Sequence, residues 1–171
     1  MKSATILAVV LFVLCLAISA NAQKRKRTTR PAAAATKTIN AVEIKSGADK
    51  VSTQIKNVSK FIYVLGGVAR VIENLDLDIA AQKASQNAPE LNAKNKQAVV
   101  TTIKNLRAGL VALEIEFRTK PALKNYLFQI QGISGMSGVA EDQATAGQIS
   151  ESGKTLLLVV EKLSDTLVAM P

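Results

Sequence analysis

The feature that most constrains this chain is a long series of apolar residues spaced alternately four and three positions apart. The series runs from Ile44 to Ile72 without a break. Apolar residues at this spacing lie on one face of an α-helix, so the series predicts a long amphipathic helical region. A second apolar stripe beside its last part predicts that this part is covered from several sides, as the centre of a helical bundle is. The second stripe consists of Phe61, Val64, Val68 and Val71.

The Gly66-Gly67 pair lies inside this helical region, which extends from Thr38 to about Lys83. A glycine in a helix interior costs about 1 kcal/mol relative to alanine. The pair is therefore expected to serve either the close approach of another helix or a hinge. The region forms either one helix or two helices that join at the glycines or near Asn74.

A second amphipathic helix is predicted after a turn at residues 85–89, where Pro89 and the asparagine before it signal a new helix start. This helix is about 28 residues, or roughly 40 Å, long. It ends at Lys120-Pro121, because proline disfavours helix at the residue before it. Its apolar face consists of Val99, Ile103, Leu106, Leu110, Leu113 and Phe117.

Two further helices complete the pattern: a short one after Pro121 and a last one from about Glu141 to Leu167. No alternation of β-branched residues predicts a strand. The fold class is therefore all-α, an up-and-down antiparallel helical bundle of four to five helices over residues 38–171. The inward residues are expected to be Leu123, Tyr126, Leu127 and Ile130 in the short helix, and Ala146, Ile149, Gly153, Leu156, Val160, Leu163, Leu167 and Met170 in the last one.

Three glycines spaced three apart, at positions 132, 135 and 138, separate these two helices. They follow no strand and lack the ending of a phosphate-binding loop. We expect a flexible connection, or alternatively an adaptable apolar surface patch that folds against an apolar partner. The patch would consist of Ile133, Met136 and Val139.

Residues 1–22 have the plan of a secretory signal peptide. Lys2 is followed by an apolar run, and Ala20 and Ala22 provide small residues at positions −3 and −1 of a cut after Ala22. The alternative is an uncleaved anchor, but the run is shorter than the ~20 residues of a spanning helix. We therefore expect a secreted protein, extracellular or in the cell wall, with no transmembrane segment in the mature chain. Cys15 lies in the signal, so the mature chain would contain no thiol.

Residues 23–37 are predicted to form a disordered basic arm. Together with Lys2, the arm holds seven of the 22 basic side chains, which leaves 15 against 13 acidic ones, or a net charge of +2 out of +9, for the rest. Three uses are open: a dibasic processing site after Arg27, binding of a polyanion such as an acidic polysaccharide, or no role. No aromatic residue interleaves the basic cluster, so nucleic acid is not an expected partner. The cluster consists of Lys24, Arg25, Lys26, Arg27 and Arg30.

Asn57-Val58-Ser59 is an N-glycosylation sequon. Val58 belongs to the first apolar stripe, so Asn57 is expected to face outward, where a glycan can be accommodated. The alternative is an ordinary polar surface residue.

The residues present point to a non-enzymatic protein without a catalytic, cofactor or metal site. The chain contains no histidine, which removes the histidine-based nucleophile systems and the commonest zinc ligand. The pairs Asp76/Asp78 and Glu114/Glu116 would point about 200° apart on a helix. Glu73 and Asp76 share a helix face, which a solvated surface explains.

Two stretches carry a family resemblance. Thr119-Lys120-Pro121-Ala122-Leu123 closes the central helix, and Ser137-Gly138-Val139 with Ala144 and Leu163 has the spacing of a final helix. With the signal peptide and the cysteine-poor helices, these stretches resemble the secreted fungal hydrophobic surface-binding proteins, which are related to cell-wall mannoprotein antigens. The chain departs from that family in its lysine content and in the Gly66-Gly67 pair. The resemblance implies adsorption to hydrophobic surfaces and recruitment of hydrolases to solid substrates, and no catalytic residues.

Three functions are open from the sequence. The first is a secreted non-enzymatic bundle that binds an apolar surface or lipid through its inner seams, which would open at the glycine pair. The second is a cell-wall or matrix component held on acidic polymer by the basic arm. The third is a secreted effector or inhibitor that docks a protein partner on a helix face.

Overall fold

The computed structural model describes residues 32–171, with side chains from residue 37 onward. Every regular element in this range is helical, which confirms the predicted all-α bundle. The elements are α2 (Ala32–Ala80), α3 (Ala88–Thr119), the 3-10 helix η2 (Pro121–Tyr126), α4 (Leu127–Ile130), α5 (Ile133–Thr145) and α6 (Ile149–Ala169). The predicted signal peptide and the predicted basic cluster lie outside the described residues; the cluster is Lys24, Arg25, Lys26, Arg27 and Arg30.

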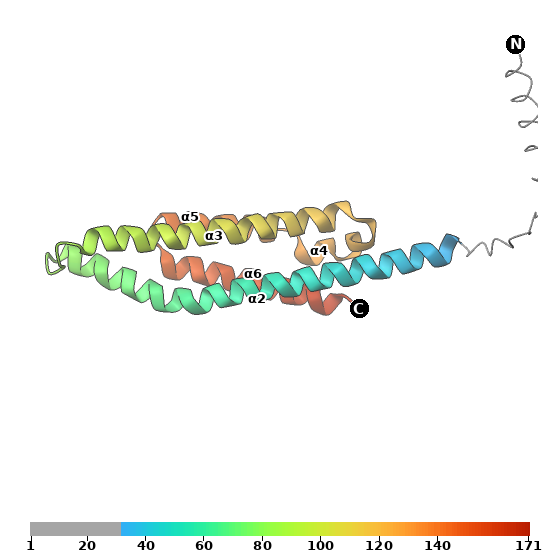
Figure 1. The fold of residues 1–171 in the computed structure, drawn as a ribbon, viewed down its shortest axis with the longest axis horizontal. Helices are drawn as coiled ribbons and strands as arrows, with labels where there is room; N and C mark the ends of the chain where they lie inside the picture. Colours follow the sequence, from blue (N-terminus) through green and yellow to red (C-terminus); the bar gives the residue numbers. More distant parts are fainter. Residues whose placement is uncertain (1–31) are drawn as a thin grey trace, which may run out of the picture. The chain divides into compact units, whose positions relative to one another are not determined.

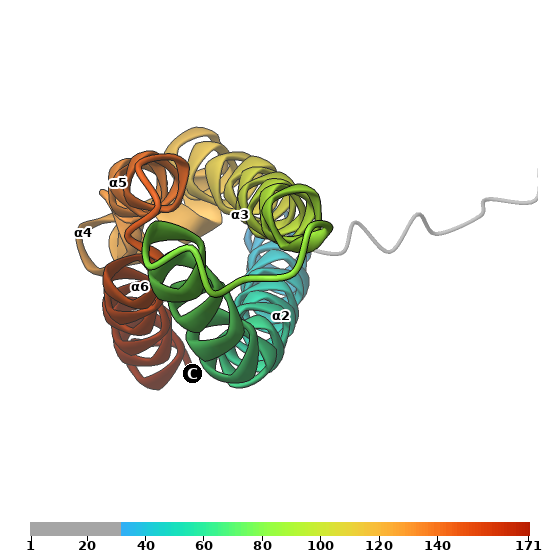
Figure 2. The same ribbon diagram turned by 90° about the vertical axis from the view of Figure 1, so that its left-hand side faces the viewer.

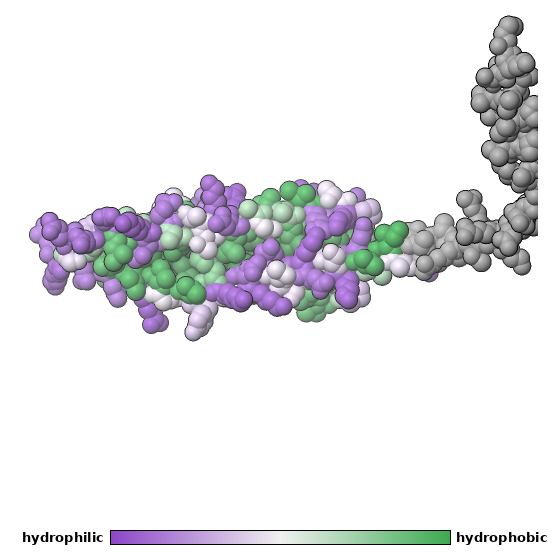
Figure 3. All heavy atoms as spheres, in the orientation of Figure 1, coloured by the Kyte–Doolittle hydropathy of each residue, from purple (hydrophilic) through white to green (hydrophobic). Residues whose placement is uncertain are grey.

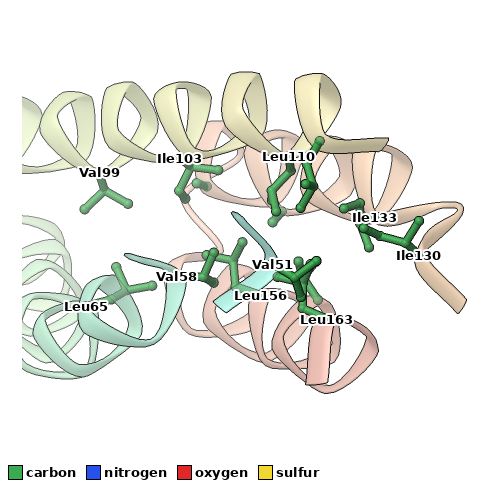
Figure 4. Close-up of a cluster of buried hydrophobic side chains, with 14 of the residues drawn as sticks. Val51, Val58, Leu65, Val99, Ile103, Leu110, Ile130, Ile133, Leu156 and Leu163 are labelled. Atoms are coloured by element: carbon green, nitrogen blue, oxygen red, sulfur yellow. The ribbon is translucent and has the colours of Figure 1, made fainter. Parts of the chain in front are cut away.

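The helices α2, α3, α5 and α6 alternate in direction around a common core, as in an up-and-down bundle (Figure 1). Viewed from the end, α2 and α3 lie on one side and α6 and α5 on the other, with α4 beside the latter two (Figure 2). In the core, Val58 of α2, Ile103 of α3 and Leu156 of α6 point into the same interior space (Figure 4), and all three are fully buried.

α2 is one continuous helix, so the predicted alternative of a break at Gly66-Gly67 or near Asn74 is wrong. The helix changes direction in its teal-green middle part (Figure 1), and glycine is a common cause of helix bends. A Cβ atom at Gly66 or Gly67 would meet nothing within 4 Å, so the pair does not serve the close approach of another helix. α2 begins at Ala32, which makes residues 32–37, expected in the arm, helical.

α3 follows the prediction at both ends. Asn87 precedes it, Pro89 lies in its first turn, and Lys120 ends it in an extended conformation before Pro121. The proline is tolerated there because the first amides of a helix have no intrahelical acceptor. Its predicted face is buried at Val99, Ile103, Leu110, Leu113 and Phe117, and half-buried at Leu106.

The predicted flexible connection at residues 132–138 is wrong, because α5 begins at Ile133. Gly132 has a φ of 92° and supplies the turn before that helix. Gly138 lies inside α5, where a Cβ atom would be 3.4 Å from the guanidinium carbon of Arg107. Packing against α3 thus overrides the low helix propensity of glycine.

The last predicted helix is divided into two helices, and the second of them, α6, is rotated about its own axis relative to the prediction. Gly147, with a φ of 81°, separates α5 from α6. Ile149, Leu156 and Leu163 of α6 are buried as predicted, with Met170 just beyond. Ser152, Val159 and Thr166 are also buried, whereas the predicted Gly153, Val160 and Leu167 are half-buried and Ala146 is exposed. Thr166 donates its hydroxyl hydrogen to the carbonyl oxygen of Lys162 at 2.8 Å, so the helix itself satisfies this buried polar group. The inward face of α6 is therefore rotated by part of a position from the predicted one, and Gly153 faces α2.

Candidate functional site

Near its bend, the second half of α2 has one buried face and a partly exposed flank on each side of it. Successive residues of a helix are rotated by about 100°, so Leu65, Ala69 and Ile72 share one face, and all three are buried in the core. One flank of this buried face lies against α3, and the other lies against α6.

On the α3 flank, the second apolar stripe of α2 is only partly covered. Phe61 and Val68 are half-buried against the core, but Val64 is 59% exposed and Val71 is 50% exposed. The prediction that the stripe is covered from several sides is therefore wrong on this flank, because α3 reaches only its inner edge. Figure 3 shows apolar side chains gathered here, over the second half of α2 and the space between α2 and α3.

A shallow depression of about 200 Å³ continues this surface onto α3. Its lining includes no charged residue, and Val64 is the exposed valine that lies in it. The lining residues are Val64, Val68, Asn95, Ala98, Val99 and Thr102. We call the four residues Phe61, Val64, Val68 and Val71 the α2 stripe.

On the α6 flank, a groove of about 320 Å³ runs between α2 and α6. Two glycines make room for it. A Cβ atom at Gly66 would project into open space, and a Cβ atom at Gly153 would lie 3.3 Å from Cδ2 of Leu65. The groove is lined by Ile62, Leu65, Gly66, Ala69, Arg70, Glu73, Ile149, Ser150, Gly153, Lys154 and Leu157.

The charged groups of this groove are unequally partnered. Glu73 accepts a hydrogen bond from the hydroxyl group of Ser150, which joins α2 to α6. Lys154 forms an exposed ion pair with Glu151 at 2.7 Å. Arg70 makes no ion pair or hydrogen bond within residues 37–171, so its guanidinium is the unpartnered charge of the groove.

The carboxylate pairs of the sequence are separated by their partners. Asp76 accepts hydrogen bonds from the Asn92 amide and the Lys96 ammonium of α3, at 2.7 Å each, whereas Glu73 turns to α6. These carboxylates brace helices and do not converge on a common space. Within residues 37–171, no three carboxylate, histidine or cysteine side chains are placed to hold a metal ion together.

Glu114 is the most enclosed charge in the described part of the chain, with a residue exposure of 5%. Its carboxylate accepts the backbone N–H groups of Gly132 and Ser134 at 3.1 Å each and the Ser134 hydroxyl at 2.7 Å. Arg118 completes the site at 3.1 Å. Glu114 therefore caps the first turn of α5, which has no cap from its own side chains.

These contacts decide the protonation state of Glu114. Burial alone raises its pKa, but the hydrogen bonds from Ser134 and Gly132 and the charge of Arg118 outweigh burial and hold the pKa below its ordinary value. Glu116, two residues later, points to different partners and pairs with Lys50 of α2 at 2.6 Å. Burial likewise raises its pKa, and the bonds from Lys120 and Lys50 lower it further than burial raises it.

The other predicted site residues are dispersed. Ile133 is fully buried and Met136 half-buried against the core, so only Val139 of the predicted patch is exposed, at 50%. The three residues therefore do not form one surface patch. Asn57 is exposed on α2, which confirms that it faces outward. Its glycosylation stays a prediction.

Sequence reasoning missed the groove between α2 and α6. The available signals were Gly153, which stands within the apolar series of its helix, and Gly66, which directly follows Leu65 of the series on α2. Their pairing depends on which helices are neighbours, and the turn of α6 brings Gly153 to the α2 side.

No helix among residues 32–171 combines the length and the apolar character needed to cross a membrane. The chain matches no protein-family model, no curated protein and no solved structure.

Proposed function

We propose that this chain is a secreted, non-enzymatic helical bundle that adsorbs to apolar surfaces or lipid. One observation carries the proposal: the α2 stripe leaves Val64 59% and Val71 50% exposed, and Val64 lines a mostly apolar depression. Clustered apolar side chains on a protein surface commonly mark an interaction site, whereas single ones do not. The proposal needs no opening of the inner seams, because this stripe is already accessible.

The expected energy of adsorption follows from the area that the surface would cover. Apolar area removed from water contributes about 25 cal/mol per Å². Two half-exposed valines would thus contribute about 1 kcal/mol each, and the partly exposed residues around them add to this. The contribution is apolar, so high salt does not weaken it.

The experiment measures adsorption of the secreted protein to hydrophobic beads at low and high salt. The double variant Val64→Gln/Val71→Gln keeps good helix formers at both positions. We expect its partition coefficient to fall by roughly tenfold or more, because about 2 kcal/mol of apolar contact is lost. Urea unfolding of each variant checks that the bundle is intact.

The matched control is Leu91→Gln/Ile115→Gln. Both of these side chains lie on α3 and are 53% exposed, so the control removes a similar exposed apolar area away from the stripe. Equal loss of adsorption in the two double variants would contradict a specific surface. Adsorption that salt abolishes would instead favour attachment through the basic arm to acidic polymer.

A further inference from the structure

The groove between α2 and α6 has a geometry distinct from the α2 stripe. The two lie on opposite sides of the buried face of α2, and they share no lining residue. The groove has an apolar floor made by Leu65, Ala69 and Ile149, and the two glycines keep it free of side chains. Its volume of about 320 Å³ is at the lower end of the range typical of small-molecule sites.

Arg70 gives this groove a positively charged lining residue. Helical side chains lean toward the N-terminus of their helix, over the preceding turn. For Arg70 that turn contains Gly66, where no side chain competes for the space. The guanidinium group therefore has an open apolar channel beside it and no carboxylate on it.

The absence of a partner distinguishes Arg70 from the other described arginines. Arg107 is paired with Glu141 at 2.9 Å, and Arg118 is paired with Glu114 at 3.1 Å. Glu73, the acidic residue that lines the groove, accepts a hydrogen bond from the Ser150 hydroxyl group and forms no ion pair with Arg70. A guanidinium group binds carboxylate or phosphate oxygens through two parallel hydrogen bonds, so this one is available to an anion from outside the chain.

We propose that the groove binds a single-chain amphiphile with an anionic head group, taken up as a free molecule. The chain of the ligand lies along the apolar floor past Gly66 and Gly153, and its head group binds the guanidinium of Arg70. The volume of about 320 Å³ leaves room for one alkyl chain rather than several. Lys154 adds a second positive charge at the rim, which its exposed pairing with Glu151 only partly offsets.

The test compares three dodecyl amphiphiles by titration calorimetry, each below its critical micelle concentration. They are dodecyl phosphate, dodecyl glucoside and dodecylammonium, which share one tail and differ in head-group charge. We expect dodecyl phosphate to bind about tenfold more tightly than the glucoside, because its head group gains charge-assisted hydrogen bonds. Dodecylammonium should bind the most weakly.

Two variants separate the head group from the tail. Arg70→Gln should reduce the affinity for dodecyl phosphate to that for the glucoside and leave the glucoside unchanged. Gly66→Leu places a side chain in the groove and should weaken the binding of all three. The control is Lys60→Gln, which removes a positive charge from an exposed residue of the same helix that does not line the groove.

Three results would overturn this inference: no binding of any of the three, equal affinity for the three head groups, or a loss in Arg70→Gln that is equal for phosphate and glucoside. Binding of anionic vesicles but not of the free amphiphile would also overturn it. Adsorption to beads is measured separately through Val64 and Val71, so failure of either proposal can be recognised without the other.

Discussion

Two regions of this bundle use glycine and charge in opposite ways. At the start of α5, Gly132 adopts a φ of 92° and donates its N–H group to Glu114. At the α2–α6 groove, Gly66 is an ordinary helical residue with open space where a Cβ would be. Glu114 has four hydrogen-bonding or ionic contacts from Gly132, Ser134 and Arg118, while Arg70, one turn after Gly66, has none among the residues whose side chains are described.

The difference indicates which region holds the fold and which is free to bind. A buried charge whose hydrogen bonds are all made within the protein gains nothing from a ligand, and its loss destabilises the fold. An unpartnered guanidinium beside an empty apolar channel adds little to stability, and a ligand can still satisfy it. The variants below test this contrast, in order of decreasing effect.

The largest effect is expected for Glu114→Gln. This substitution removes the charge that two backbone N–H groups and one hydroxyl group bind, and it turns an amide toward hydrogen-bond donors. We expect the free energy of unfolding to fall by about 2 kcal/mol, measured by urea denaturation. The control Glu90→Gln affects only an exposed i,i+4 pair with Lys94 and should change stability by less than about 0.5 kcal/mol. Similar losses in both would refute the capping role.

The lowered pKa of Glu114 predicts that the stability of the fold depends on pH in the acidic range. Its pKa is lower in the folded than in the unfolded chain, so its contribution is complete above the ordinary glutamate pKa and is lost as the pH falls through the folded value. We therefore expect urea midpoints of the wild-type protein to fall as the pH decreases below about 4.5. The urea midpoint of the Glu114→Gln variant should decrease less steeply with falling pH. The decrease that remains should include the contribution of Glu116, whose pKa is also lowered. Parallel curves would contradict the lowered pKa.

Alanine should have opposite effects at the two glycines. Gly132→Ala forces a side chain into a left-handed conformation and should cost about 1 kcal/mol or more. Gly66→Ala meets no atom within 4 Å and should stabilise α2 by about 0.5–1 kcal/mol. Thermal unfolding of both variants measures whether each substitution lowers or raises the stability. A loss at Gly66 would mean that the bend of α2 needs the glycine.

The smallest effect is expected for Lys154→Gln. Both members of its ion pair are largely exposed, at 70% and 53% for the side chains of Lys154 and Glu151. Such pairs contribute little, so stability should change by less than about 0.5 kcal/mol. Binding of dodecyl phosphate should fall less than in Arg70→Gln. A larger loss in Lys154→Gln would move the head group from α2 to α6.

The sequence predicts the fold class well because the apolar series of α2 and α3 are long and unbroken. Val51, Val58 and Ile103 are buried as that spacing requires. The C-terminal region is less predictable from local signals, since glycine favours loops in isolation, whereas α5 is a helix that packs against α3 with Gly138 facing Arg107. The cap by Glu114 likewise joins residues 18 and 20 positions apart, which no helix-end pattern reveals.

The candidate site was partly accessible to sequence reasoning. The α2 stripe is visible as Phe61, Val64, Val68 and Val71, but its exposure depends on how far α3 reaches across it. The groove depends on two glycines of different helices and on the turn of α6, which buries Ser152 and Thr166 instead of more apolar neighbours. Local hydrophobicity predicts the burial of Ile149, Leu156 and Leu163 in α6 but not that of Ser152 and Thr166.

The long α2 helix has a consequence for how the chain folds. Its two halves differ in how far apart in sequence their contacts are: Lys50 in the first half meets Glu116 across 66 positions, whereas Asp76 near the end meets Asn92 and Lys96 across 16 and 20. Contacts among the later helices lie between these values, as between Arg107 and Glu141 across 34. Because closing long loops costs more entropy, we expect the end of α2 to pair early with the start of α3 and the first half of α2 to dock last. The amides of the first half of α2 should then exchange with solvent through openings that leave the rest of the bundle protected.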